Sequence, residues 1–201
     1  MKFNIQQTTH DYFTQTELVT REAFWDLYQP GCTEHLMVRQ IRASTEYIPQ
    51  LDHFAVFDDG TVAGHIIYTH SRLVMPDGEK EVITFGPISV LPEYQKMGIG
   101  SALIEHTKSV AKALGYLGVV IFGSSDYYPR FGFRDAREFS ITTSDGGNFP
   151  EFMALPLWEG SLNGCRGRLY ISDAYETTNE ALEAMEREFP PKESCFKNKN
   201  S

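Results

Sequence analysis

The stretch Val-Leu-Pro-Glu-Tyr-Gln-Lys-Met-Gly-Ile-Gly, residues 90–100, joins an apolar run to an amphipathic segment. The first turn of a helix leaves backbone N–H groups without partners, and the helix dipole adds partial positive charge at the same end. Gly98 and Gly100 lack a Cβ, so backbone there can approach a phosphate oxygen closely. The stretch therefore predicts an anion-binding turn between a strand and a helix.

The residues before this stretch predict two helices and an antiparallel meander. Apolar side chains recur at one-turn intervals in two segments, and Thr14 with Glu17 has capping-box spacing in the first. Asp59-Gly60 predicts a hairpin with a type I′ turn, which needs positive φ at both central residues. The predicted helices cover residues 10–28 and 33–42, and the predicted strands cover residues 3–7, 52–58, 61–74 and 81–90.

After the glycines, a helix over residues 99–114 leads into an almost wholly apolar strand over residues 116–122. Such a crossover makes the strands on either side of the helix parallel. Pro87 cannot donate a ladder hydrogen bond, so its strand is expected to part from a neighbour there. Later strand candidates are residues 139–142, 152–157 and 167–171, followed by a helix over 177–189 with Thr177 and Glu180 at capping-box spacing.

Together these elements predict an α+β fold. We expect a mixed central sheet of about six to seven strands, splayed near Pro87 and flanked by helices on both faces. The chain of 201 residues suits a single domain, which we place at residues 1–190 with a flexible tail at 191–201.

Composition excludes several classes of protein. The chain has 18 basic and 27 acidic residues and a net charge of −9, which argues against general nucleic-acid binding. No apolar run approaches the roughly 20 residues that span a membrane, and residues 1–15 do not resemble a signal peptide. We therefore expect a soluble cytoplasmic protein. Cys32, Cys165 and Cys195 are widely spaced, so neither a disulfide framework nor a metal site is expected.

The glycine pair matches neither a Walker loop nor the Rossmann spacing of three glycines. Residues 95–100, Gln-Lys-Met-Gly-Ile-Gly, instead resemble the signature of the GCN5-related N-acetyltransferase (GNAT) superfamily: Arg or Gln, two residues, Gly, one residue, Gly or Ala. Residues 128–133, Tyr-Pro-Arg-Phe-Gly-Phe, resemble that family's second segment. The strong resemblance covers residues 84–135, and the part around residues 124–133 is similar to a bacterial subgroup of predicted acetyltransferases.

The resemblance implies acetyl-CoA as acyl donor and no metal. The splayed strand would pair with the pantetheine arm through the backbone of Ile88 and Val90, and the N–H of Ile88 would polarise the thioester carbonyl. Backbone N–H groups of the glycine turn would hold the pyrophosphate. The residues implied in cofactor binding are Ile88, Ser89, Val90, Gln95, Lys96, Met97, Gly98, Ile99, Gly100, Ser101, Ser124, Tyr127, Tyr128 and Phe131.

Tyr128 is the catalytic residue that the resemblance implies. Direct transfer leaves a CoA thiolate, which a nearby phenol can protonate as general acid. Packing against the cofactor is the structural alternative for Tyr128, and Tyr127 is interpreted as a pocket wall. Many family members carry an asparagine seven residues before the tyrosine, where this chain has Ile121. The polar contact is then left to Ser124, Ser125 or Asp126.

No general base is evident in the sequence. Glu81 and His70 lie on strands that could line the pocket, and His35 lies on the second predicted helix. A water chain to a distant carboxylate would also serve. His65 and His70 are five apart on one strand and so face opposite sides, which makes them a poor metal pair.

The predicted function is direct transfer of an acetyl group to a primary amine in a ternary complex. The acceptor is a small molecule or a peptide, and neither a nucleic acid nor a membrane is an expected partner. One alternative is a non-catalytic acyl-CoA-binding sensor, and a weaker one is transfer of a longer acyl group. A homodimer remains open.

Overall fold

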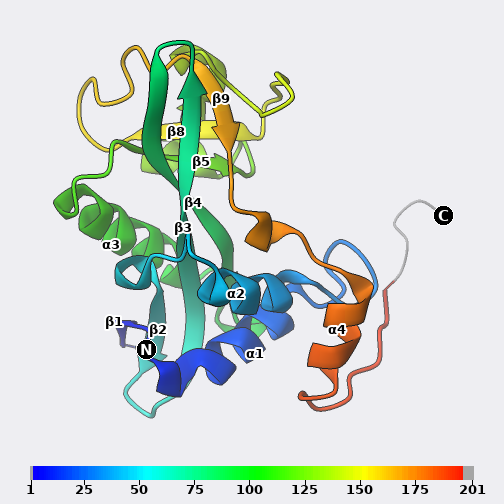
Figure 1. Ribbon diagram of the computed structural model, residues 1–201. Coiled ribbons are helices and arrows are strands. Elements are labelled where there is room, and N and C mark those ends of the chain that lie inside the picture. Colours follow the sequence, from blue (N-terminus) through cyan, green and yellow to red (C-terminus); the bar gives the residue numbers. More distant parts are fainter. Residues whose placement is uncertain (1, 197–201) are drawn as a thin grey trace.

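A long antiparallel hairpin forms the spine of the computed structural model, which describes residues 2–196 (Figure 1). Its two strands are β3 (Val62–Met75) and β4 (Gly78–Val90). The other strands are β1 (Phe3–Gln7), β2 (His53–Phe57), β5 (Gly118–Phe122), β6 (Arg134–Asp135), β7 (Ile141–Thr142), β8 (Phe152–Pro156) and β9 (Gly167–Tyr170). The helices are α1 (Phe13–Phe24), α2 (Glu34–Ala43), α3 (Ile99–Ala113) and α4 (Asn179–Glu186).

The strands form one mixed sheet. Their order is β1-β2-β3-β4-β5-β8-β6, with β9 pairing β3 and β7. The predicted crossover is confirmed, because β4 and β5 are parallel neighbours on either side of α3. The described residues give nine strands rather than six or seven, since β6 and β7 are only two residues long and carry too little pattern to be recognised.

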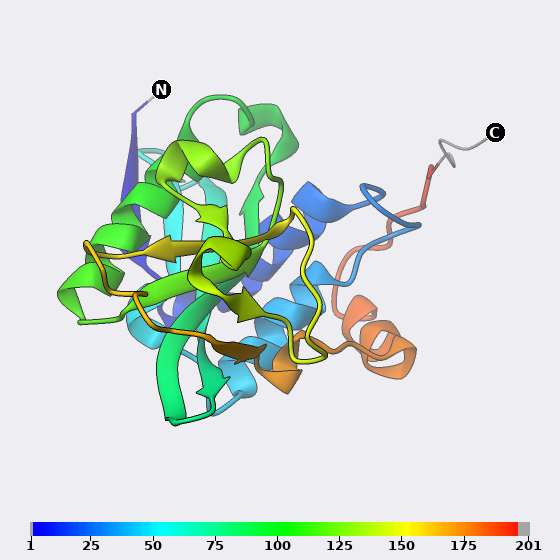
Figure 2. The ribbon, with the colours of Figure 1, turned by 90° about the horizontal axis from the view of Figure 1, so that it is seen from above.

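Helices cover both faces of the sheet, as predicted (Figure 2). Successive side chains of a strand point to opposite faces. On β2, Phe54 packs with Val19 of α1, whereas its neighbour Ala55 shares a cluster with Ile99 and Leu103 of α3. The apolar stripe of α3 therefore packs on one face, and α1 packs on the other.

The predicted turn and cap details at the N-terminal side need correction. The hairpin at Asp59-Gly60 is present, but only Gly60 has positive φ, at +88°, so the turn is not type I′. Thr14 lies inside α1 and caps nothing. Glu17 is buried instead, with its carboxylate Oε2 2.8 Å from Nη2 of Arg39 on α2. The long-range ion pair takes the place of the local cap.

Two predicted helices are longer than the observed ones. The first was expected to reach residue 28, but α1 ends at Phe24, and Asp26 is left-handed at φ +58°. The last begins one residue later than the capping pattern indicated. Thr178, rather than Thr177, is its N-cap, and its Oγ1 accepts a hydrogen bond from the Ala181 N–H at 3.3 Å.

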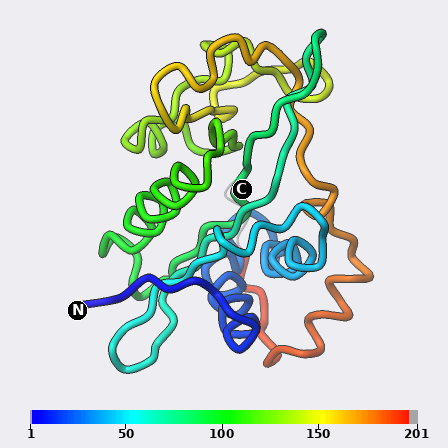
Figure 3. Tube along the Cα trace, turned by 60° about the vertical axis from the view of Figure 1, so that its left-hand side comes forward, coloured from blue at the N-terminus to red at the C-terminus, as the bar shows by residue number. Residues whose placement is uncertain are grey.

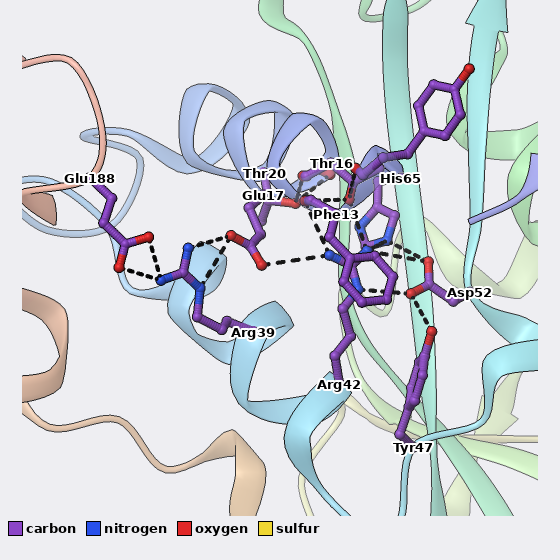
Figure 4. A network of polar contacts seen from close by, with 12 residues as sticks. Phe13, Thr16, Glu17, Thr20, Arg39, Arg42, Tyr47, Asp52, His65 and Glu188 are labelled. Atoms are coloured by element: carbon purple, nitrogen blue, oxygen red, sulfur yellow. Dashed lines mark hydrogen bonds and ion pairs between the residues drawn. The ribbon is translucent and has the colours of Figure 1, made fainter. Parts of the chain in front are cut away.

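A buried polar network fixes α2 against the sheet (Figure 4). The Asp52 carboxylate accepts hydrogen bonds from Nε of Arg42 at 3.0 Å and from the Tyr47 hydroxyl at 2.9 Å, and it lies 2.9 Å from Nε2 of His65. Asp52 and His65 are fully buried. Because a buried charge needs both partners and hydrogen bonds, this network holds α2 in one position relative to β3.

The chain after β9 descends along the molecule to α4, which lies beside α1 and α2 (Figure 3). The Glu186 carboxylate is 2.7 Å from Nη2 of buried Arg21 and 2.9 Å from Nε2 of His35. Further on, the Cys195 N–H donates to the Asp26 carboxylate at 2.6 Å. The predicted boundary at residue 190 stays a prediction, and residues 197–201 of the predicted tail lie outside the described residues.

We expect the protein to lose stability as the pH falls from 7.5 to 5.5. Burial lowers the pKa of His35 and of His53 to about 4, and it lowers the pKa of His65 as well. The unfolded state, with histidine pKa values near 6.5, then binds more protons than the native state. Stability is therefore fully present above pH 6.5 and decreases towards pH 4.

The expected loss within that window is about 1.4 kcal/mol for each pH unit and for each of His35 and His53, and His65 adds to it in the same direction. Urea unfolding followed by circular dichroism at the two pH values measures it. A free energy of unfolding that is equal at pH 7.5 and 5.5 would contradict the neutral state of the three buried histidines.

Candidate active site

The turn between β4 and α3 has two left-handed residues. Lys96 has φ +62° and Gly98, the N-cap of α3, has φ +86°. Left-handed backbone is uncommon for a residue with a Cβ, and alternating backbone of this kind turns successive N–H groups to one side. The local geometry thus forms a concave turn that suits an anion.

The start of α3 adds unpaired donors to this turn. The first hydrogen bond of the helix runs from the Ala102 N–H to the Gly98 carbonyl at 2.9 Å. The N–H groups of residues 99–101 precede it and have no partner within the helix. They carry the positive end of the helix dipole.

These elements surround a cavity of about 580 Å³, which we call the donor cavity. Nine of the residues predicted to bind the cofactor line it: Ile88, Val90, Gln95, Lys96, Gly98, Ile99, Gly100, Ser101 and Tyr127. A Cβ added at Gly100 would point towards Val90, Ile88 and the Tyr127 hydroxyl at 3.6–3.9 Å, so this glycine faces the interior of the cavity.

β4 separates from β5 as the strand approaches the donor cavity. The two strands share one registered pair in the described residues, Ile83 with Val119. The pairing of β4 with β3 continues to Val90, although its register shifts between Ile66 and Tyr68. One edge of β4 is therefore unpaired over its last residues, consistent with the splay expected at Pro87.

A second cavity, of about 630 Å³, adjoins the first, and we call it the inner cavity. The two cavities share a wall made of Ile88, Val90, Gln95 and Tyr127. Tyr128 and Ser124 line the inner cavity. The structure thus brings the strand edge, the glycine turn and Tyr128 to two adjoining cavities.

An aromatic cluster fixes the ring of Tyr128. Its centroid lies 5.7 Å from that of Phe85, 5.6 Å from that of Phe133 and 5.2 Å from that of Tyr127. Its hydroxyl has no hydrogen-bond partner among residues 2–196. Burial, with Tyr127 nearby, raises the pKa of Tyr128, so its phenol is protonated at neutral pH and holds a proton that it can donate.

Three predicted cofactor residues line neither cavity. Met97 is 46% exposed, and Phe131 is buried behind Tyr127. Ser89 is buried, with its Oγ 3.0 Å from Oγ1 of Thr20 on α1. The Ser89 side chain therefore holds β4 to α1. Only the backbone of Ser89 is then left to contact a cofactor.

The candidate bases lie away from Tyr128. His70 and Glu81 contact each other at 2.7 Å and line a separate cavity of about 480 Å³. His35 is fully buried beside Glu186. Ile121, which stands where many relatives have asparagine, is a core residue, and Ser125 and Asp126 line neither cavity.

Two charged residues that line the cavities, Arg130 and Glu34, had no role assigned from the sequence. Arg130 lines the donor cavity, with its guanidinium 4.5 Å from the Tyr127 ring centroid and its Nε donating to the Tyr127 carbonyl at 2.9 Å. Glu34 lines the inner cavity. Arg130 stands within the quoted segment 128–133, so a signal was present, whereas Glu34 carries no motif.

Residues 2–196 contain no group of three or more His, Cys, Asp or Glu side chains placed to hold a metal ion. In the same range, no helix combines the length and apolar character required to cross a membrane.

A splayed strand, a glycine turn at a helix start and a tyrosine in the adjoining cavity match the site expected for an N-acetyltransferase. The chain belongs to the acetyltransferase (GNAT) family, whose pattern matches residues 18–133. Among curated proteins it is similar to the uncharacterized N-acetyltransferase YjhQ of Escherichia coli (strain K12), with 33% identity over 75 residues. That match spans 37% of this chain and 41% of YjhQ.

Two solved structures share the fold. The GNAT family N-acetyltransferase YhbS from Escherichia coli, in complex with CoA, has a TM-score of 0.77 at 20% identity and covers 87% of this chain and 92% of its own. A GNAT family acetyltransferase from Brucella melitensis, in complex with acetyl-CoA, has a TM-score of 0.70 at 25% identity and covers 87% and 99%. These likenesses extend beyond the matched motifs to most of the chain.

Proposed function

We propose that this protein transfers the acetyl group of acetyl-CoA directly to a primary amine. The observation that carries the proposal is the shared wall of the two cavities. A donor whose phosphates lie at the glycine turn would reach along β4 to the inner cavity, where an acceptor meets the thioester beside Tyr128.

The residues of the donor cavity fit a CoA pyrophosphate. Backbone N–H groups of Lys96, Gly98, Gly100 and Ser101 would hold its oxygens, and the side chains of Lys96 and Arg130 would add positive charge. Acetyl-CoA complexes of a structural neighbour support this assignment.

The free edge of β4 would hold the pantetheine arm through backbone groups of Ile88 and Val90. The N–H of Ile88 would then polarise the thioester carbonyl as negative charge develops on its oxygen. Thr20 and Ser89 would keep the strand in place from behind, because their hydroxyl groups contact each other at 3.0 Å.

Tyr128 would act as general acid. The neutral amine attacks the thioester carbonyl, a C–N bond forms and the C–S bond breaks. The departing sulfur takes the phenolic proton, and the nitrogen, now part of an amide, loses one proton that restores the phenol directly or through water. Atoms and charge balance without any further reactant.

Incubation with acetyl-CoA and a panel of small amines and peptides tests the proposal by release of the CoA thiol. We expect thiol release that depends on the amine and an acetylated product of matching mass. Tight acetyl-CoA binding with no turnover on any amine would instead favour the acyl-CoA sensor, and faster turnover with longer acyl groups would favour a different donor.

The proposal also covers the kind of acceptor and the place where the protein acts. Two structural neighbours, with TM-scores of 0.53 and 0.54, are the ribosomal-protein-S18-alanine N-acetyltransferase from Escherichia coli and Chaetomium thermophilum Naa20 in complex with a bisubstrate analogue. The first of these neighbours acts on a protein, so this fold is compatible with a protein or peptide acceptor. A cytoplasmic site of action would suit the use of acetyl-CoA, and a homodimer remains a proposal.

A further inference from the structure

The inner cavity is lined mainly by aromatic and aliphatic side chains. Besides Tyr128, the cavity is lined by the end of α1 and the loop after it, by α2, and by the end of β5. The side chains that matter here are those of Phe24, Leu27, Tyr28, Met37 and Phe122. None of them lies within residues 95–100 or 128–133, the two short segments that carry the GNAT resemblance.

The mouth of this cavity exposes large apolar side chains. Leu27 is 48% exposed, Tyr28 72% and Phe122 48%. Phe149 continues the surface, because its ring stacks on that of Phe122 with centroids 5.9 Å apart. Clustered exposed apolar side chains mark a place where an apolar ligand or partner removes them from water.

One charged group faces this apolar space. Among the described lining residues, Glu34 is the only acidic or basic side chain. It is half-buried at the start of α2, where its Oε2 accepts a hydrogen bond from the Thr33 N–H at 3.0 Å. It makes no ion pair with any residue from 2 to 196.

A carboxylate in an apolar cavity is stabilised by a cation. Partial burial without a cationic partner disfavours its charged form, and burial accordingly raises the pKa of Glu34. A ligand ammonium would supply the missing partner. A second charge on the ligand would find no counter-charge on the cavity wall and would be desolvated at a cost.

We propose that the acceptor is a small monoamine with one aromatic-sized apolar group that packs between Tyr28 and Phe122. Its ammonium pairs with Glu34 on binding and loses one proton to water before the neutral nitrogen attacks the thioester. The role of this amine as acceptor rests on the proposed acetyl transfer. The binding site for the amine is inferred from the lining of the inner cavity alone. It makes Glu34 an acceptor-binding residue and disfavours polyamines and charged peptides.

Calorimetry on the protein saturated with CoA tests binding without turnover, with 2-phenylethylamine, n-propylamine and spermidine as probes. Burial of the ring should make 2-phenylethylamine bind roughly thirtyfold more tightly than n-propylamine. A charge-assisted hydrogen bond to the ammonium should make Glu34→Gln bind it about tenfold to a hundredfold more weakly. Glu159→Gln, at an exposed carboxylate outside both cavities, is the matched control and should bind it as the wild type does.

Tyr28→Ala provides a second variant that does not endanger folding, because Tyr28 is largely exposed. It should reduce the preference for 2-phenylethylamine over n-propylamine several-fold. Where the protein is active, Glu34→Gln should raise the KM for the amine and leave the KM for acetyl-CoA unchanged.

The outcomes separate this inference from the proposed function. Tighter binding of spermidine or of a glycine-terminated peptide than of 2-phenylethylamine, or equal binding of 2-phenylethylamine to Glu34→Gln and wild type, overturns the inference even if amines are acetylated. If 2-phenylethylamine binds in a way that depends on Glu34, but the assay with acetyl-CoA and the amine panel gives no thiol release, the binding site is supported. The acetyltransferase proposal is then overturned instead.

Discussion

Tyr128→Phe is expected to lower kcat by about 100-fold or more, which is the usual contribution of a positioned general acid. Only the hydroxyl is removed, and that hydroxyl makes no hydrogen bond to residues 2–196. The phenylalanine ring would keep the contacts with Phe85 and Phe133. The affinity for CoA should therefore remain within about twofold, since that change corresponds to only ~0.4 kcal/mol.

Stopped assays of thiol release, with CoA affinity measured separately by calorimetry, distinguish the two roles of Tyr128. Tyr127→Phe is the matched control, because Tyr127 lines both cavities and its pocket-wall role needs the ring alone. Full activity in Tyr128→Phe would assign Tyr128 to packing. A large loss in Tyr127→Phe with activity retained in Tyr128→Phe would transfer the acid role to Tyr127.

Gly100→Leu is expected to weaken CoA binding by at least about 100-fold, equivalent to losing two charge-assisted hydrogen bonds. The Cβ at this position points into the donor cavity, and a leucine side chain would occupy the space of the phosphates. The fold should be unaffected, since Gly100 is a helical residue without positive φ and leucine is a better helix former than glycine.

Gly100→Ala is the control for this variant. An added methyl group would meet its nearest neighbours at 3.6 Å, which is ordinary contact, so CoA binding should persist. Gly98 offers no such clean pair, because its φ of +86° means that any side chain also strains the turn. Unchanged CoA affinity in Gly100→Leu, with melting curves like those of the wild type, would place the donor elsewhere.

Local pattern was enough to predict the elements around the glycine turn. Three local patterns predicted structure there: the apolar stripe of α3, the apolar run of β5 and the proline in β4. The helix, the strand and the separation of β4 from β5 are all confirmed. They also lie close together in sequence. Most residues that line the donor cavity could therefore be predicted from one continuous stretch, residues 88–101.

The lining of the inner cavity could not be predicted in this way. Glu34 faces the inner cavity because α2 is held by the contacts of Arg42 with Asp52 and of Arg39 with Glu17. Those contacts join residues that no local pattern connects. The local pattern likewise assigned Glu17 to a helix cap, because it cannot show that the partner of Glu17 is Arg39, 22 residues further along the chain.

The parting of β4 from β5 has a consequence for self-association. An unpaired strand edge is normally a template on which other chains add strands and aggregate. Here the edge lies in the middle of the sheet, Pro87 removes one of its donors, and Tyr127 and Tyr128 line the space beside it. A second molecule could add a strand there only by entering between β4 and β5, where these aromatic side chains already lie. The gap in the sheet can therefore be kept open for a ligand without becoming a site of aggregation.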